Sequence, residues 1–186
     1  MKTVICSAEE IRATVQMRID ALPADAVIGL AYGEDTAGFR FGSRRVLQIM
    51  DTESGLLRAA THFDGMVEDY DGERIDFLIL GLGRKAQIGF NEIGSGFDSG
   101  LRRQKLTKST KEDYAFLGEV PDFGMTLGIR DIVRAEEIVV IATGEKRADA
   151  VFSMLYARND GTVPAAFLQI PPKVTVYSDP AAASRL

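Results

Sequence analysis

The chain is poor in the residues that carry metal and nucleophilic chemistry. Its 186 residues include one histidine, one cysteine and no tryptophan. A structural zinc site takes about four Cys or His ligands, so the chain has too few for one, and a single cysteine forms no internal disulfide. A Ser-His-Asp or Cys-His mechanism would need His62 as its base. Carboxylates, Lys, Arg, hydroxyls and backbone amides remain, so we expect no metal and no cofactor.

The composition also lacks an excess of positive charge and long apolar runs. The formal net charge is −5, with 46% apolar and 26% charged residues, as in an ordinary globular domain spanning residues 1–186. Mild acidity argues against a nucleic-acid partner, and no apolar run approaches the ~20 residues of a membrane span. The N-terminus has no signal-peptide pattern, and a lone cysteine fits a reducing compartment. We therefore expect a cytoplasmic location.

Strand and helix patterns alternate along the chain. Ser7 and Glu10 form a capping box, and apolar residues at helical spacing predict a helix that ends near Leu22. Further helices are predicted from the apolar stripes at 56–67 and 148–155, and a short one after Asp179-Pro180. The buried strands are predicted at residues 3–6, 26–31, 46–50, 75–80, 138–142 and 174–177.

This alternation predicts the fold class α/β. We expect a single open, doubly wound, mostly parallel sheet with helices on both faces. Ligands of such sheets bind beyond the carboxyl ends of the strands. The loops after residues 31, 50, 80 and 142 are therefore the places to look for a site.

The segment 81–105 is rich in glycine and not periodic, which is typical of a functional loop. Its start, Gly81-Leu82-Gly83-Arg84-Lys85-Ala86, fits the loose dinucleotide pattern G-x-G-x-x-A. That pattern requires a helix directly afterwards, and the sequence QIGFNEIGSG that follows here is not helical. A glycine turn that leaves a strand is the better interpretation.

The longer string LGLGRKAQIGFNE, residues 80–92, resembles the signature of the glucosamine-6-phosphate deaminase family, which belongs to a larger group with 6-phosphogluconolactonases. The resemblance is close from Ile75 to Gln169 and poor between residues 36 and 73, where the chain carries deletions relative to the family. Further similar segments, in order, are Val27–Leu30, Met50-Asp51, Leu106-Thr107 and Gly144–Ala148.

The resemblance implies an aldose-to-ketose isomerisation of an amino-sugar phosphate with loss of ammonia. In the family, a His assisted by an Asp and a Glu opens the sugar ring, and a separate Asp moves a proton between two carbons. The family's Asp-Gly-His triplet falls on Lys85, Ala86 and Gln87 here, whereas its Glu is retained as Glu92 and its proton-transfer Asp as Asp51. The candidate catalytic residues are therefore Asp51, Glu92, Lys85 and Gln87.

The resemblance also places the phosphate-binding positions. The family's phosphate loop falls on Gly33, Glu34 and Asp35, its phosphate Arg on Phe116 and its phosphate Lys on Arg147. Two carboxylates would repel a phosphate by roughly 1 kcal/mol per charge pair at 4 Å in water. Gly33, Asp35 and Arg147 are the candidate substrate-binding residues.

A cationic run contains two further candidates. In some relatives this stretch contributes to a regulatory phosphate site, so Arg102 and Arg103 are candidate anion-binding residues. A solvated face is the competing interpretation, because Glu112 and Asp113 follow directly. The run also contains Lys105, Lys108 and Lys111.

Three functional hypotheses stay open. The first is a divergent deaminase-like protein that has lost efficient deamination, because its ring-opening His and phosphate loop are replaced. The second is an isomerase of a different, unphosphorylated sugar, with Asp51 and Glu92 as base and acid and Lys85 stabilising an enediolate oxygen. The third is a non-catalytic binding or regulatory module. All three imply a small sugar or sugar phosphate as partner, and they leave self-association open.

Overall fold

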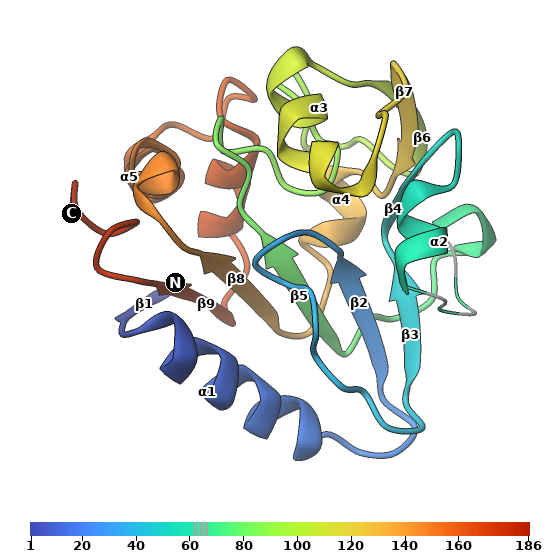
Figure 1. Cartoon of the computed structure of the whole chain (residues 1–186), viewed down its shortest axis with the longest axis horizontal. Helices are drawn as coiled ribbons and strands as arrows, with labels where there is room; N and C mark the ends of the chain where they lie inside the picture. Colours follow the sequence, from blue (N-terminus) through green and yellow to red (C-terminus); the bar gives the residue numbers. More distant parts are fainter. Residues whose placement is uncertain (62, 64, 66) are drawn as a thin grey trace.

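A six-stranded parallel sheet forms the centre of the molecule (Figure 1). The computed structural model describes residues 1–61, 63, 65 and 67–186. The strand order is β1-β9-β8-β5-β2-β3, and every neighbouring pair is parallel. Its strands are β1 (Lys2–Ile5), β2 (Val27–Ala31), β3 (Arg45–Gln48), β5 (Phe77–Gly81), β8 (Ile138–Ala142) and β9 (Val174–Ser178).

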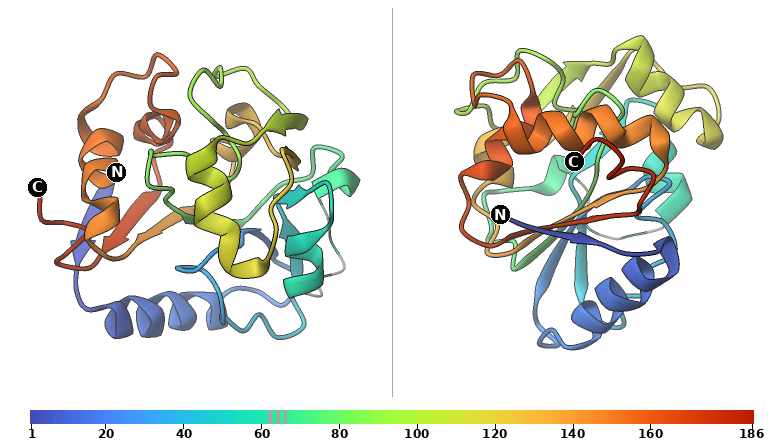
Figure 2. Two further views of the ribbon diagram at one scale, coloured as in Figure 1. Left: turned by 45° about the horizontal axis from the view of Figure 1, so that its top comes forward. Right: turned by 90° about the vertical axis from the view of Figure 1, so that its left-hand side faces the viewer.

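Helices cover both faces of this sheet, so the predicted α/β class is confirmed (Figure 2). The central strand β8 is buried at all five positions because both its faces are covered. One face packs on α1 (Ala8–Asp20) through Ile11, Val15 and Ile19. The predicted capping box is present at its start, where Ser7 and Glu10 satisfy each other's backbone amides.

The opposite face carries the larger core. Leu78, Leu80 and Val140 point into it. The elements that supply or flank this core are α2 (Leu56–Thr61), α4 (Ile129–Ile132), α5 (Ala148–Tyr156) and the 3-10 helix η4 (Pro164–Gln169).

Above the carboxyl ends of the parallel strands lies a second, small sheet that the sequence patterns did not predict. It is antiparallel, in the order β4-β7-β6. The short helix α3 (Lys108–Tyr114) follows β6, and 3-10 turns η1 (Val67–Asp69), η2 (Ala115–Leu117) and η3 (Glu145–Arg147) complete the chain. The strands of this second sheet are β4 (Met50–Thr52), β7 (Phe123–Thr126) and β6 (Arg102–Lys105).

Two further predictions have definite outcomes. The prediction of a helix after Asp179-Pro180 is wrong, because residues 180–185 form successive turns. Asp179 does act as a cap, since its carboxylate accepts from the Ala182 and Gly144 amides. His62 lies outside the described residues. Among the residues that are described, no helix is long and apolar enough to cross a membrane.

The sheet topology indicates where a ligand would bind. Strand β3 lies on one side of β2 and β5 on the other, so the chain changes winding direction across the sheet at β2. At such a switch point the loops that leave the two strands diverge and open a crevice. The loops after β2, β5 and β8 are therefore the walls of the candidate site.

Candidate functional site

The crevice at the switch point is nearly filled. The cavity between the loops after β2, β5 and β8 measures about 30 Å³, which is room for one or two water molecules and not for a sugar. Its lining residues include Gly33, Glu34, Asp35, Gly83, Gln87, Asp113, Tyr114 and Arg147.

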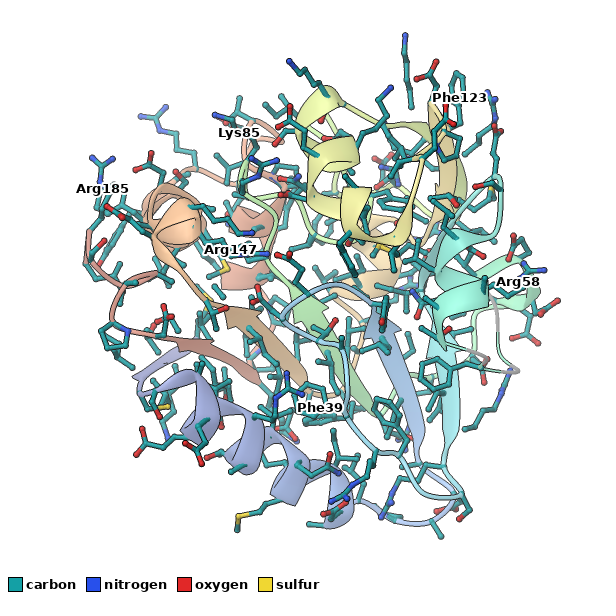
Figure 3. The ribbon with its side chains drawn as sticks, in the orientation of Figure 1. Phe39, Arg58, Lys85, Phe123, Arg147 and Arg185 are labelled. Carbon is teal, nitrogen blue, oxygen red and sulfur yellow. The ribbon has the colours of Figure 1, made fainter. Side chains whose placement is uncertain are left out.

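A buried ion pair closes the cavity. Arg147 Nε lies 2.9 Å from Asp35 Oδ2, and the two side chains are only 7% and 5% exposed. The guanidinium also donates to the carbonyls of Leu82 (2.9 Å) and Thr143 (3.2 Å), and the Thr143 hydroxyl donates to Asp35. Arg147 thus holds the ends of β5 and β8 and the β2 loop together (Figure 3).

The charges of this cluster balance internally. Burial raises the pKa of the Asp35 carboxyl, and the Arg147 guanidinium opposes that rise without cancelling it. Glu34 accepts from Lys146 Nζ at 2.8 Å, and this hydrogen bond lowers the pKa of Glu34. Arg147 Nη2 lies 3.7 Å from the same Glu34 carboxylate. Both acidic residues of the β2 loop are therefore paired with the cations that follow β8.

Tyr114 of α3 also lines the cavity. Its ring meets Phe90 edge to face at 5.3 Å, and its hydroxyl lies 3.8 Å from Met50 Sδ. Burial raises the pKa of the Tyr114 hydroxyl. A Cβ at Gly33 would lie 3.6 Å from that hydroxyl oxygen, so the β2 loop and α3 are in contact range.

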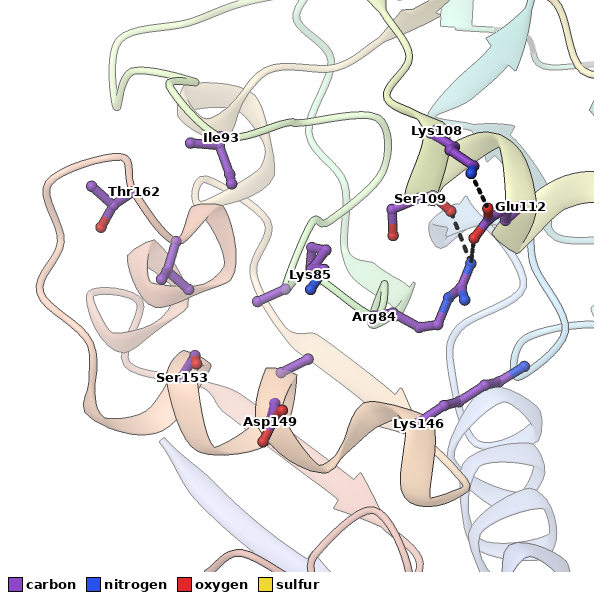
Figure 4. Close-up of a pocket in the computed structure, with 13 residues that line it drawn as sticks. Arg84, Lys85, Ile93, Lys108, Ser109, Glu112, Lys146, Asp149, Ser153 and Thr162 are labelled. Atoms are coloured by element: carbon purple, nitrogen blue, oxygen red, sulfur yellow. Dashed lines mark hydrogen bonds and ion pairs between the residues drawn. The ribbon is translucent and has the colours of Figure 1, made fainter.

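Gln87 lines the cavity, and hydrogen bonds hold its side chain in place. Its amide nitrogen donates to Thr110 Oγ1 (3.1 Å) and Asp113 Oδ2 (3.3 Å), and its amide oxygen accepts from the Lys85 backbone N–H. Gly83 is required here, because a Cβ at that position would overlap the Gln87 side chain. The Lys85 side chain, in contrast, is exposed and lines a different pocket (Figure 4).

Glu92 caps α3 from the preceding loop. The Thr107 amide (2.9 Å) and the Thr110 hydroxyl (2.6 Å) both donate to Oε1, and the Thr107 hydroxyl donates to Oε2 at 3.2 Å. The carboxylate is buried, with the residue only 6% exposed. It fixes the N-terminus of the helix that carries Tyr114.

Asp51 occupies an equivalent position at α2. Its Oδ1 accepts from the amides of Leu57 (3.0 Å) and Thr52 (2.8 Å), so it caps the helix. Burial raises its pKa, and the backbone hydrogen bonds oppose the rise. Arg58 Nε lies 3.6 Å from Oδ2, the oxygen that accepts no hydrogen bond within the described residues.

The structure therefore separates the candidate residues into groups. Gly33, Asp35, Gln87 and Arg147 line one small cavity. Asp51 and Glu92 are buried at the starts of α2 and α3, where each satisfies backbone amides. Lys85 lines a different, open pocket.

Of the two candidate anion-binding residues, only Arg102 is half-buried. Its Nη2 donates to Asn91 Oδ1 and Ser95 Oγ, both at 2.8 Å, and burial lowers its pKa. Arg103 pairs with Glu53 and lies over the ring of Phe123, at 3.5 Å from the centroid.

Sequence reasoning missed three residues of this region. Asp113 accepts from Arg84 and Gln87, Tyr114 lines the cavity, and Thr143 donates to Asp35. Thr143 could have been found from the sequence, because it directly follows β8, at the carboxyl end of a predicted strand. Neither Asp113 nor Tyr114 had one, because α3 shows no apolar periodicity.

The chain is similar in sequence to known glucosamine-6-phosphate deaminases. It is 36% identical over 132 residues to a glucosamine-6-phosphate deaminase from Halalkalibacterium halodurans, covering 69% of this chain and 53% of the relative. It is 42% identical over 138 residues to one from Streptococcus thermophilus, covering 66% and 59%. The chain is a homologue of the glucosamine-6-phosphate deaminases. It spans little more than half the length of these curated relatives, and no protein-family model matches it.

Solved structures show the same fold. A monomeric glucosamine-6-phosphate deaminase superposes with a TM-score of 0.83 at 24% identity, covering 100% of both chains. The 6-phosphogluconolactonase of Trypanosoma brucei gives 0.72 at 14% identity, covering 100% of this chain and 98% of the other. The fold expected from the deaminase resemblance is thus confirmed.

Proposed function

We propose that this deaminase homologue acts in amino-sugar phosphate metabolism but does not run the usual isomerisation and deamination at an enzyme's rate. One observation carries the proposal: Arg147, at the position of the family's phosphate Lys, is bound by Asp35 in a cavity of about 30 Å³. The sequence identity to named deaminases supports the metabolic assignment.

The carboxylate of Asp35 takes the place that a substrate phosphate would need. A phosphate approaching Arg147 would meet Glu34 and Asp35, which come from the same loop and already bind Lys146 and Arg147. Each carboxylate–phosphate pair at 4 Å costs roughly 1 kcal/mol in water and about 4 kcal/mol at the effective dielectric of a protein surface. Binding would require the internal pair to open and then overcome this repulsion.

The proton chemistry is also missing at its expected place. Ring opening needs a group that gains and loses a proton near neutral pH, and an amide does neither. Gln87 stands where the family has its His, and its amide is held by Thr110 and Asp113.

Turnover of glucosamine-6-phosphate tests the proposal. Ammonia and fructose-6-phosphate would be measured with the Streptococcus thermophilus deaminase as positive control under the same conditions. We expect this chain to stay well below the roughly 1–1000 per second typical of enzymes. Turnover within that range would contradict the proposal.

A second candidate function rests on Asp51. A buried carboxyl with a raised pKa suits general acid–base catalysis. The second hypothesis is therefore that the chain isomerises an unphosphorylated sugar, with Asp51 and Glu92 as its base and acid. It predicts that any sugar turnover detected is abolished in both Asp51→Asn and Glu92→Gln. Turnover that survives either substitution would remove it.

Anion binding at the cationic run also stays a proposal. Arg102 is the better candidate, because its donors go to neutral oxygens, whereas Arg103 is paired with Glu53. Thermal shifts with sulfate should decrease in Arg102→Gln and persist in Arg103→Gln. A shift unchanged in Arg102→Gln would exclude Arg102 as the anion site.

A further inference from the structure

An open pocket lies beside the closed cavity, on the α5 side of the 84–87 loop (Figure 4). Its volume is about 620 Å³, within the range of about 300–1,000 Å³ that is usual for small-molecule sites. The walls come from the loop after β5, from α3, from the η3–α5 segment and from residues 162–163 after α5, so four parts of the chain build it.

The pocket is cationic in an acidic protein. Four cationic and two acidic side chains line it, which gives a formal charge of 4 − 2 = +2, against −5 for the whole chain. The cations are Arg84, Lys85, Lys108 and Lys146, and the acids are Glu112 and Asp149. A net positive, concave surface favours an anionic ligand.

Lys85 is the cation that is free to meet such a ligand. Arg84 is bound by Asp113 and Glu112, and Lys146 by Glu34. Within the part of the chain that the structure describes, Lys85 makes no ion pair. In Figure 4 it lies in the middle of the ring of labelled residues.

The remaining lining suits a small polyhydroxylated molecule. Ser109 and Ser153 present hydroxyls from α3 and α5, on opposite sides of Lys85 in Figure 4, and Thr162 adds a third. The apolar lining consists of Ala86, Ala150, Ile93 and Val163, which offers contact to the carbon skeleton of a ring.

We propose that this pocket binds a phosphorylated sugar, with Lys85 contacting the phosphate and the Ser and Thr hydroxyls contacting the sugar. The pocket is distinct from the cavity of Arg147 and Asp35. Binding here would not require the internal ion pair to open, and it does not depend on whether the chain turns over any substrate.

Calorimetric titration of the full chain with glucosamine-6-phosphate tests this inference, with glucosamine and inorganic phosphate as separate probes. We expect glucosamine-6-phosphate to bind more tightly than either probe. One charge pair in water at 4 Å is worth a factor of roughly five in affinity, so Lys85→Ala should weaken binding about fivefold and Lys85→Glu by about twentyfold. Lys173→Ala, at an exposed lysine that does not line the pocket, is the matched control and should bind like the parent chain.

A steric variant separates the pocket from other sites. Ser153→Trp fills the pocket from the partly exposed face of α5 and should abolish binding while circular dichroism shows an unchanged fold. Loss of binding in Arg102→Gln with retention in Lys85→Glu would place the ligand at Arg102 and overturn the inference. Absence of binding by the parent chain at glucosamine-6-phosphate concentrations up to about 10 mM, tenfold above a weak Kd of ~1 mM, would also overturn it. Turnover is measured separately, so failure here leaves the proposed loss of deamination intact.

Discussion

The Asp35–Arg147 pair offers the sharpest stability prediction. Removing one partner of a buried ion pair typically costs about 3–5 kcal/mol, because the other charge stays buried without its counter-charge. Arg147 keeps the carbonyls of Leu82 and Thr143 as acceptors, so we expect Asp35→Ala to cost about 3 kcal/mol, the lower end of that range. For a domain of this size that corresponds to a fall in Tm of about 6–12 °C.

The neighbouring carboxylate supplies a matched control. Glu34 also pairs with a cation, but its side chain and that of Lys146 are 45% and 50% exposed. Exposed pairs contribute about 0–1 kcal/mol, so Glu34→Ala should lower Tm by no more than about 4 °C. Differential scanning calorimetry of the two variants at one pH gives the comparison.

Phosphate should then stabilise the Asp35→Ala variant more than the parent chain. Once the carboxylate is gone, Arg147 has no internal anion at 2.9 Å, and an added anion replaces it. A loss of stability in Asp35→Ala no larger than that in Glu34→Ala, or an equal rise in Tm with phosphate for parent and variant, would contradict this prediction.

Three further predictions concern single positions. Ala86 and Gly89 share a φ of 57°, a backbone conformation that favours glycine. Ala86→Gly should therefore stabilise the chain by up to about 1 kcal/mol, and Gly89→Ala should destabilise it by about 1–2 kcal/mol. Changes of the same sign in the free energy of unfolding, measured in urea, would contradict this. Burial raises the pKa of Asp51 above its ordinary 3.8, so stability should fall as the pH rises from about 3.8 through the folded-state pKa. Asp51→Asn, which does not ionise, should lack that part of the decline when urea midpoints are compared between pH 4 and 7. Glu92→Ala should lower the free energy of unfolding by about 1–3 kcal/mol, because the Thr107 amide and the Thr110 hydroxyl lose their acceptor. A shift of the urea midpoint no larger than that of Glu53→Ala would argue against this role of Glu92.

Local patterns were enough to predict the main sheet. The capping box of α1 and the uninterrupted apolar run of β8 depend on residues that are close in sequence, and both appear in the structure. The second sheet could not be found in this way. Strand β6 reads Arg-Arg-Gln-Lys, and it becomes a strand through its pairing with β7, about 20 residues later.

The candidate site was only partly predictable for the same reason. The sequence indicated that Glu34 and Asp35 would repel a phosphate, but it did not show that Arg147 turns toward them. That contact joins loops on opposite sides of β5 and exists only because β2 and β8 both pair with β5. Asp51 and Glu92 illustrate the converse, since a carboxylate that caps a helix looks identical in sequence to one that moves a proton.

A crystal structure of the chain grown with excess glucosamine-6-phosphate is the most direct test of the central claim, that an internal carboxylate closes the phosphate position. We expect Asp35 and Arg147 to stay in contact, with no phosphate between Arg147 and the β2 loop. A phosphate bound to Arg147, with Asp35 displaced, would contradict it.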